Sequence, residues 1–134
     1  MIQLLLVDDD DINNFLLGFL LKKSGFEVEL QKFTNPVEAL SFLKKCSADG
    51  KQFDLLLLDI NMPVMSGWEV LEELRLEQSS SLLGTKIYML SSSVHTTDME
   101  QAEKYQEVSG FISKPITVEK LTEIFSEISL SKSE

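Results

Sequence analysis

The sequence predicts a single α/β domain built on a doubly wound, five-stranded parallel sheet, in which a strand followed by a helix is repeated five times. Short uninterrupted apolar runs alternate with longer amphipathic stretches, as expected when a parallel sheet is covered on both faces. Residues that begin and end helices occur between these runs. The chain has 134 residues, 43% of them hydrophobic, which suits one core.

Four of the predicted strands are continuous apolar runs, and one alternates. A continuous run is expected for a strand buried on both faces, whereas alternation indicates an edge strand with one face partly wet. In chain order the predicted strands are residues 4–7, the alternating stretch 26–33, and then residues 55–58, 87–90 and 111–112.

The first two helices are marked by residues that favour helix ends. The first is predicted from Asp10 to Lys23, with Gly25 ending it. The second begins at Asn35 as the N-cap, with a proline at the first helical position and a capping-box glutamate, and runs towards Lys45. The apolar positions of the first helix are Ile12, Phe15, Leu16, Phe19 and Leu20.

The last three helices are predicted from apolar spacing and one further capping box. The third covers residues 67–76. The fourth opens at Thr97 and contains few large apolar residues, which we take to be Met99, Tyr105 and Val108. A Ser-rich connection at residues 78–85 separates the third helix from the fourth strand. The fifth helix places Leu121, Ile124, Phe125 and Ile128 on one face.

The chain is strongly acidic, since 22 Asp and Glu against 12 Lys and Arg give a formal net charge of -10. Phosphate binding needs clustered basic residues, and the chain has a single arginine, Arg75, so nucleic acid is not an expected partner. No stretch approaches the roughly 20 uninterrupted apolar residues of a membrane span, and the first residues lack the basic start of a secretion signal. We therefore expect a cytoplasmic protein that does not bind membranes.

Polar residues directly follow most of the predicted strands. The carboxyl ends of parallel strands meet at one edge of the sheet, where ligands bind, so we expect these side chains to converge. Carboxylates in one cleft repel one another unless a cation lies among them, and Mg²⁺ prefers oxygen ligands. A carboxylate beside a metal, a lysine and a hydroxyl is equipped to accept a phosphoryl group itself. The residues are Asp8, Asp9, Asp59, Ser91, Ser113 and Lys114.

Four segments together resemble the receiver domain of two-component response regulators. The resemblance covers nearly the whole chain, with the segments in the family's order and spacing. Each segment alone is weakly specific, whereas the four in order are highly specific. The segments are Leu6-Val7-Asp8-Asp9-Asp10, residues 57–63 followed by Ser66-Gly67, Met89-Leu90-Ser91, and Phe111-Ile112-Ser113-Lys114-Pro115.

The resemblance implies a flavodoxin-like fold with strand order 2-1-3-4-5 and a phosphorylation site. Asp59 would be the phosphoacceptor, taking a phosphoryl group from a phosphohistidine of a histidine kinase or a phosphotransfer protein. Asp9, Asp59 and the backbone carbonyl of Asn61 would hold Mg²⁺, and Asp8 would act through a bound water.

The resemblance also implies a switch that reports phosphorylation to other proteins. Lys114 would pair with the phosphoryl group, and Ser91 would hydrogen-bond to it after transfer. Phe111 takes the place of the aromatic residue whose rotamer follows that hydroxyl, but without a phenol group its switching could only be steric. The fourth helix, fifth strand and fifth helix form the family's usual output face, to which an unknown downstream protein would bind. The family commonly has a cis bond before the proline, here Lys114–Pro115.

The expected protein is a binding switch and not a classical enzyme, because it would catalyse only its own phosphorylation and dephosphorylation at Asp59. The chain ends soon after the fifth helix, so we expect a stand-alone receiver, with residues 1–128 forming the domain and residues 129–134 a frayed tail. The sequence leaves open whether the activated chain forms a homodimer.

Two other classes use parts of the same pattern. A phosphatase or phosphotransferase of the haloacid dehalogenase type would take Asp9 as nucleophile and Asp11 as acid. Against it, no Asp pair follows Lys114, and 134 residues leave no room for a cap domain. A flavodoxin-like cofactor carrier would need Gly, Ser or Thr after the first strand, where this chain is acidic.

Overall fold

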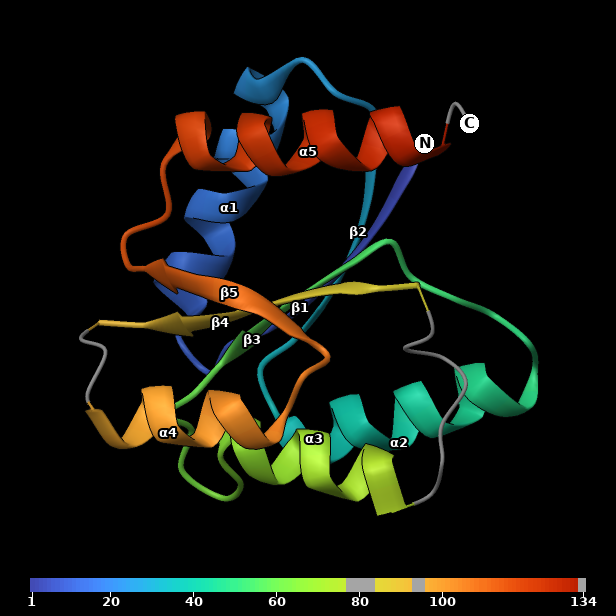
Figure 1. Cartoon of the computed structure of the whole chain (residues 1–134). Helices are drawn as coiled ribbons and strands as arrows, with labels where there is room; N and C mark the ends of the chain where they lie inside the picture. Colours follow the sequence, from blue (N-terminus) through green and yellow to red (C-terminus); the bar gives the residue numbers. More distant parts are fainter. Residues whose placement is uncertain (77–83, 93–95, 133–134) are drawn as a thin grey trace.

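Five parallel strands form one sheet through the middle of the molecule, in the order β2-β1-β3-β4-β5 (Figure 1). The structure is a computed structural model that describes residues 1–76, 84–92 and 96–132. The strand order confirms the topology that the resemblance implies. The strands are β1 (Ile2–Val7), β2 (Val28–Phe33), β3 (Leu55–Asp59), β4 (Lys86–Ser91) and β5 (Val108–Ser113).

Helices cover both faces of the sheet, which confirms the doubly wound class (Figure 1). One face carries α1 (Asp11–Ser24) and α5 (Val118–Lys132), which pack against each other. The other face carries α2 (Pro36–Ala48), α3 (Gly67–Leu76) and α4 (Thr96–Lys104). No helix in the described part of the chain is both long and apolar enough to cross a membrane.

Each strand of the central sheet contributes to two hydrophobic cores, because successive side chains of a strand point to opposite faces. Leu56 and Leu58 pack with the α2 and α3 side, whereas Leu55 and Leu57 pack with the α1 and α5 side. All four are fully buried, and full burial of one leucine side chain contributes about 1.5–3 kcal/mol. The apolar run at residues 55–58, which predicted a strand buried on both faces, is therefore the central strand β3.

The predicted end of α1 at Gly25 and the predicted start of α2 at Asn35 are confirmed, whereas α2 continues past Lys45 to Ala48. The Asp10 side chain accepts hydrogen bonds from the backbone N–H groups of Ile12 and Asn13, and Gly25 ends α1 with a φ of 79°. The Asn35 side chain accepts in the same way at the start of α2, and Pro36 occupies the first helical position. Side-chain oxygens here satisfy N–H groups that have no partner within the helix.

The prediction for the fourth helix was wrong at both ends. The helix begins at Thr96, so Thr97 is already inside it, and it ends at Lys104. Val108 is the first residue of β5, because it pairs with Ile87 of β4 in the sheet. Most of the predicted Ser-rich connection at residues 78–85 lies outside the described residues.

The C-terminal helix is longer than predicted. It continues to Lys132, where a frayed tail was expected from residue 129. The Lys132 ammonium group donates to the Met1 carbonyl oxygen at 2.8 Å and to Asp54 at 3.0 Å, so contacts with distant parts of the chain support this last turn.

Helix α1 presents most of its apolar residues to solvent. Phe15 is 74% exposed and Ile12 71% exposed, and Phe19 and Leu16 are also exposed. The helix instead buries Leu17, Leu21 and a polar residue, Asn14. Apolar residues occur on nearly every side of α1, so the sequence pattern could not show which side faces the core.

Candidate functional site

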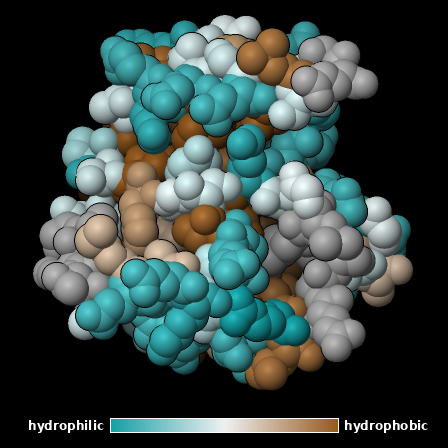
Figure 2. Space-filling view, viewed as in Figure 1, coloured by the Kyte–Doolittle hydropathy of each residue, from teal (hydrophilic) through white to brown (hydrophobic). Residues whose placement is uncertain are grey.

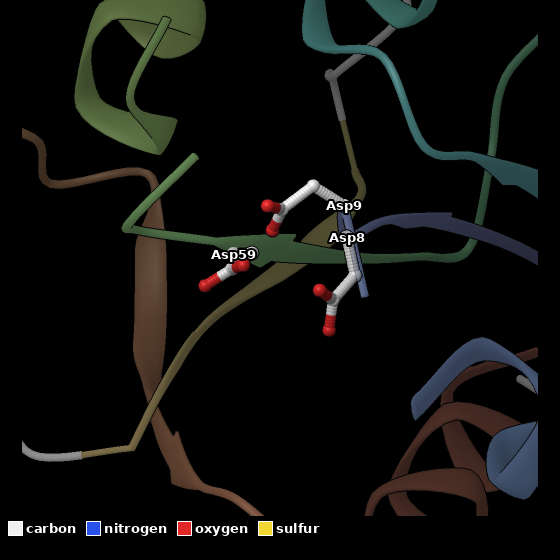
Figure 3. Close-up of side chains that lie close together, drawn as sticks. All are labelled: Asp8, Asp9 and Asp59. Carbon is white, nitrogen blue, oxygen red and sulfur yellow. The ribbon is translucent and has the colours of Figure 1, made fainter. Parts of the chain in front are cut away.

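The ends of the two central strands bring three carboxylates together (Figure 3). Asp8 and Asp9 directly follow β1, and Asp59 is the last residue of neighbouring β3. A carboxylate oxygen from each of the three lies within 4.8 Å of the others. Asp8 and Asp59 are 1% and 3% exposed, whereas Asp9 faces solvent. The predicted convergence of these three residues is confirmed.

Lys114 lies between the two buried carboxylates. Its Nζ atom is 3.0 Å from Asp8 Oδ2 and 3.2 Å from Asp59 Oδ2. The backbone N–H of Lys114 donates to the Ser91 carbonyl oxygen at 2.9 Å, which ties the residue after β5 to the end of β4. The Lys114–Pro115 bond is cis, as the resemblance implies.

Backbone groups orient the two buried carboxylates. Asp8 Oδ1 accepts a hydrogen bond from the N–H of Asp10 at 3.0 Å, and Asp59 Oδ1 accepts one from the N–H of Asn61 at 3.3 Å. Asn14 of α1 donates its side-chain N–H to the Asp8 carbonyl oxygen at 3.0 Å. We did not predict this role for Asn14, although a polar residue between apolar helix positions is a signal that could have indicated it.

The pKa values of the site reflect the burial of two carboxyl groups, Asp8 and Asp59, beside the ammonium group of Lys114. The pKa of Asp59 is raised to about 7, chiefly by burial and also by the nearby charge of Asp8, against the opposing effect of Lys114. Burial lowers the pKa of Lys114, but its hydrogen bonds and ion pairs with Asp8 and Asp59 outweigh this, so its pKa is raised overall. Lys114 is therefore held as a cation, whereas Asp59 is costly to keep ionised without a further positive charge.

Gly67 places the start of α3 directly against the phosphoacceptor candidate. A Cβ atom at this position would lie 2.5 Å from the Asp59 carbonyl oxygen and 2.8 Å from the Met89 Cε atom. The N–H of Gly67 donates to the Ile60 carbonyl oxygen at 3.0 Å. Since no side chain fits there, the glycine is required for the close packing of α3 on the end of β3.

We expect Gly67→Ala to destabilise the fold by several kcal/mol, because the new methyl group overlaps backbone at the end of β3. Gly18→Ala is the matched control, since Gly18 lies within α1 and its Cβ would meet nothing within 4 Å. That variant should gain roughly 0.5–1 kcal/mol from helix propensity. Urea unfolding of both proteins measures the difference, and equal stabilities would contradict the packing described here.

The remaining predicted site residues occupy the same edge of the sheet. Ser91 ends β4 and is fully buried, pairing in register with Ser113, whereas the adjacent Ser92 is exposed. Phe111 of β5 is half-buried beside Met89 of β4. Asn61 is exposed, and its N–H contacts Asp59. The functional roles of Ser91, Phe111 and the Asn61 carbonyl stay predictions.

Comparison with known proteins decides the family, because the model of the response regulator receiver domain matches residues 4–126. The chain belongs to this family. It is a receiver domain of two-component signalling, and the family assignment excludes the haloacid dehalogenase and flavodoxin-like carrier interpretations. The three carboxylates lie at the edge of the sheet where the resemblance implies the phosphorylation site.

Individual relatives agree with the family match. The sensory/regulatory protein RpfC of Xanthomonas campestris pv. campestris is 27% identical over 129 residues, which is 96% of this chain. This chain spans only 17% of the length of that relative.

Solved structures agree as well. A two-component response regulator from Cytophaga hutchinsonii superposes with a TM-score of 0.83 at 30% identity, covering 95% of this chain and 96% of that chain. The response regulator TrrA from Thermotoga maritima, solved in complex with Mg(2+)-BeF, has a TM-score of 0.70 at 26% identity, covering 96% and 99% of the two chains.

Proposed function

We propose that this receiver domain accepts a phosphoryl group on Asp59 from a phosphohistidine of a histidine kinase or a phosphotransfer protein, in a Mg²⁺-dependent reaction. The observation that carries the proposal is the convergence of Asp8, Asp9 and Asp59 at one edge of the sheet, with Lys114 contacting two of them. Its cytoplasmic location stays a prediction.

In the proposed reaction an oxygen of the Asp59 carboxylate attacks the phosphorus atom of the phosphohistidine. The new O–P bond forms as the P–N bond breaks, and the electrons of the P–N bond pass to the imidazole nitrogen. The histidine leaves as neutral imidazole when its other ring nitrogen carries a proton. Lys114, already 3.2 Å from Asp59, stabilises the negative charge on the transferred oxygens.

The donor set fits a divalent cation. Two of its carboxylates are buried and the third is open to solvent, and all three place an oxygen within one small volume. Asp9, Asp59 and the backbone carbonyl of Asn61 would hold Mg²⁺, with Asp8 acting through a water. When bound, the ion would neutralise charge on the phosphoryl oxygens. The related TrrA was solved with Mg(2+)-BeF, which supports this assignment.

We assign the output to the face formed by α4, β5 and α5, which points towards the viewer in Figure 2. Hydrophilic residues dominate α5 and α4 there, and hydrophobic residues are visible between α5 and β5. Ser91 and Phe111 lie on adjacent strands next to the phosphoacceptor end of the sheet, so a phosphoryl group held by Ser91 would change the space open to Phe111. A downstream protein would bind this face when Asp59 of the receiver domain is phosphorylated.

The test of the proposed function is the intact mass of the protein after incubation with acetyl phosphate and Mg²⁺. One added phosphoryl group that requires Asp59 supports the proposal. Turnover of phosphoesters that does not require Asp59 would refute it.

The exposed apolar face of α1 supports a docking site for the phosphohistidine donor. Helix α1 begins two residues after Asp9, and its exposed residues Ile12 and Phe15 lie in the first two turns. A hollow beside α1 is lined by Leu16 and Leu20 of this helix and by Asp8 and Lys114 of the site. A donor that must bring its histidine to Asp59 would therefore bury these side chains as it approached.

We expect Phe15→Ser to reduce the kcat/KM of phosphotransfer from a protein donor by roughly 10–100-fold, the equivalent of one aromatic side chain no longer buried in the complex. The rate with acetyl phosphate should be unchanged, because Asp59 and its partners are intact. Leu130→Ser, at an equally exposed position on α5, is the matched control and should behave as wild type with both donors. Equal loss with acetyl phosphate would contradict a docking role for Phe15.

A further inference from the structure

Trp68 occupies a position fixed relative to the phosphoacceptor. It is the second residue of α3 and is 8% exposed. The preceding Gly67 is packed against the Asp59 carbonyl group, so the start of α3 cannot move independently of the end of β3. The backbone that carries the indole ring is therefore anchored next to Asp59.

The indole ring contacts both ends of α4. Its Nε1–H donates to Asp98 Oδ1 at 3.3 Å, and Asp98 lies in the first turn of α4. Its face stacks on Tyr105 at 5.6 Å between ring centroids and 22° between planes, and Tyr105 follows the last residue of α4. Both partners are buried. One side chain of α3 thus holds the beginning and the end of α4.

The end of α4 is tied to the same side of α3 by two further residues. Glu72 accepts a hydrogen bond from the Tyr105 hydroxyl group at 2.7 Å. Arg75 lies 4.5 Å from the Tyr105 ring and donates to the Lys104 carbonyl oxygen at 2.7 Å. Trp68, Glu72 and Arg75 are spaced i, i+4, i+7, so they share one face of α3. This face is built to receive α4.

The same indole ring also contacts the predicted switch residue. Phe111 meets Trp68 edge-on, with 6.2 Å between ring centroids and 69° between planes. Helix α4 itself supplies little apolar contact, because Met99 is exposed and Ala102 is only half-buried. An element held by a few polar and ring contacts is easily shifted. A displaced Phe111 would act on those contacts through the indole.

We propose that Trp68 is a positioning residue that transmits a change at Phe111 to α4, through its hydrogen bond to Asp98 and its stack on Tyr105. This inference rests on the proposed function, in which a phosphoryl group on Asp59 changes the position of Phe111. It adds a defined route from the switch residue to the output face. The route runs from Phe111 of β5 to Trp68 of α3, and from Trp68 to both ends of α4.

The first test uses the fact that Trp68 is the one tryptophan of the chain, so tryptophan emission reports on this ring alone. Addition of beryllofluoride with Mg²⁺, a phosphoryl mimic, should change the emission intensity or maximum of wild type. Asp98→Ala, which removes the acceptor of the indole N–H, should alter the emission of the resting protein and reduce this response. Glu100→Ala, at an exposed position on the same helix, is the matched control and should respond as wild type.

The second test measures amide hydrogen exchange across α4. Trp68→Phe keeps an aromatic ring against Tyr105 and Phe111 but removes the N–H donor. In the resting protein we expect roughly fivefold faster exchange of α4 amides, as for the loss of one hydrogen bond, and a smaller further change on beryllofluoride addition than in wild type, because only the ring contacts remain. The acetyl phosphate adduct on Asp59 should form as in wild type, which separates signal transmission from phosphorylation.

The outcomes distinguish this inference from the function on which it rests. A protein that carries a phosphoryl group on Asp59 but shows no change in Trp68 emission would overturn the inference alone. An exchange response of α4 in Trp68→Phe that equals wild type would do the same. Failure of Asp59 to acquire any phosphoryl group would overturn the proposed function and the inference together. If Trp68→Phe does not fold, the emission of wild type and Asp98→Ala still decides the inference.

Discussion

Asp59→Asn is expected to abolish the phosphoryl adduct that forms when the protein is incubated with acetyl phosphate and Mg²⁺. An amide oxygen is a far weaker nucleophile than a carboxylate, and the Asp59 carboxylate is the one that both Lys114 and the Asn61 N–H contact. Intact mass spectrometry, with the modified residue located by fragmentation, measures the result.

Two further variants sharpen this experiment. Asp9→Asn should slow adduct formation by at least roughly 10–100-fold, because it removes a proposed metal ligand and leaves the acceptor intact. A chelator should have a similar effect on wild type. Asp11→Asn is the control, since Asp11 is exposed two residues further along and should form the adduct normally. An adduct that forms equally well in Asp59→Asn would mean that another residue is the acceptor.

The metal-free protein is expected to lose stability as the pH rises from 5 to 8. In the folded state the pKa of Asp59 is raised to about 7 from an ordinary value of 3.8. Between these two values the folded state binds a proton that the unfolded state has released, so the free energy of unfolding falls as pH rises. Above about pH 7 Asp59 is ionised in both states, and its contribution no longer changes.

Asp59→Asn should remove this pH dependence and make the metal-free protein more stable at pH 8. The expected gain is roughly 2–4 kcal/mol, or roughly 6–15 °C in Tm, because a buried carboxylate beside Asp8 is replaced by a neutral amide. Lys114→Met should have the opposite sign, since it leaves two buried carboxylates without their cation. Differential scanning calorimetry in the presence of a chelator measures both.

Asp11→Asn serves as the control for the stability series, because it removes an exposed acid at the start of α1 and should change stability by less than about 1 kcal/mol. Equal pH profiles for wild type and Asp59→Asn would contradict a raised pKa at Asp59. A stabilised Asp59→Asn protein that cannot be phosphorylated would show that the receiver site is maintained at a cost to the fold, as expected for functional sites.

Much of the fold was predictable because its signals are local. The run from Leu55 to Leu58 required a strand buried on both faces, and the caps at Asp10 and Asn35 depend on residues within one turn of each other. The positions of Asp8, Asp9, Asp59 and Lys114 could be predicted for the same reason, since the end of an apolar run marks the end of a strand.

The errors arose where contacts between distant residues decide the structure. Val108 was expected in a helix and lies in β5, because its pairing with Ile87 cannot be seen in the sequence around it. The last turn of α5 was expected to fray, but Lys132 reaches Asp54 and Met1. The exposed side of α1 was not predicted, because this helix has apolar residues on several sides. Which of these sides is buried depends on where the sheet and α5 pack against the helix.

The sequence by itself determined the class of sheet, its strand ends and the residues that meet there, because continuous apolar runs and helix caps are properties of short segments. Only the tertiary structure decided that Lys114 bridges Asp8 and Asp59, that Gly67 must lack a side chain beside Asp59, and that Trp68 lies between Phe111 and α4. These contacts join residues 30 to more than 100 positions apart or depend on the exact approach of two backbones. They are set by how the layers pack and not by any local pattern.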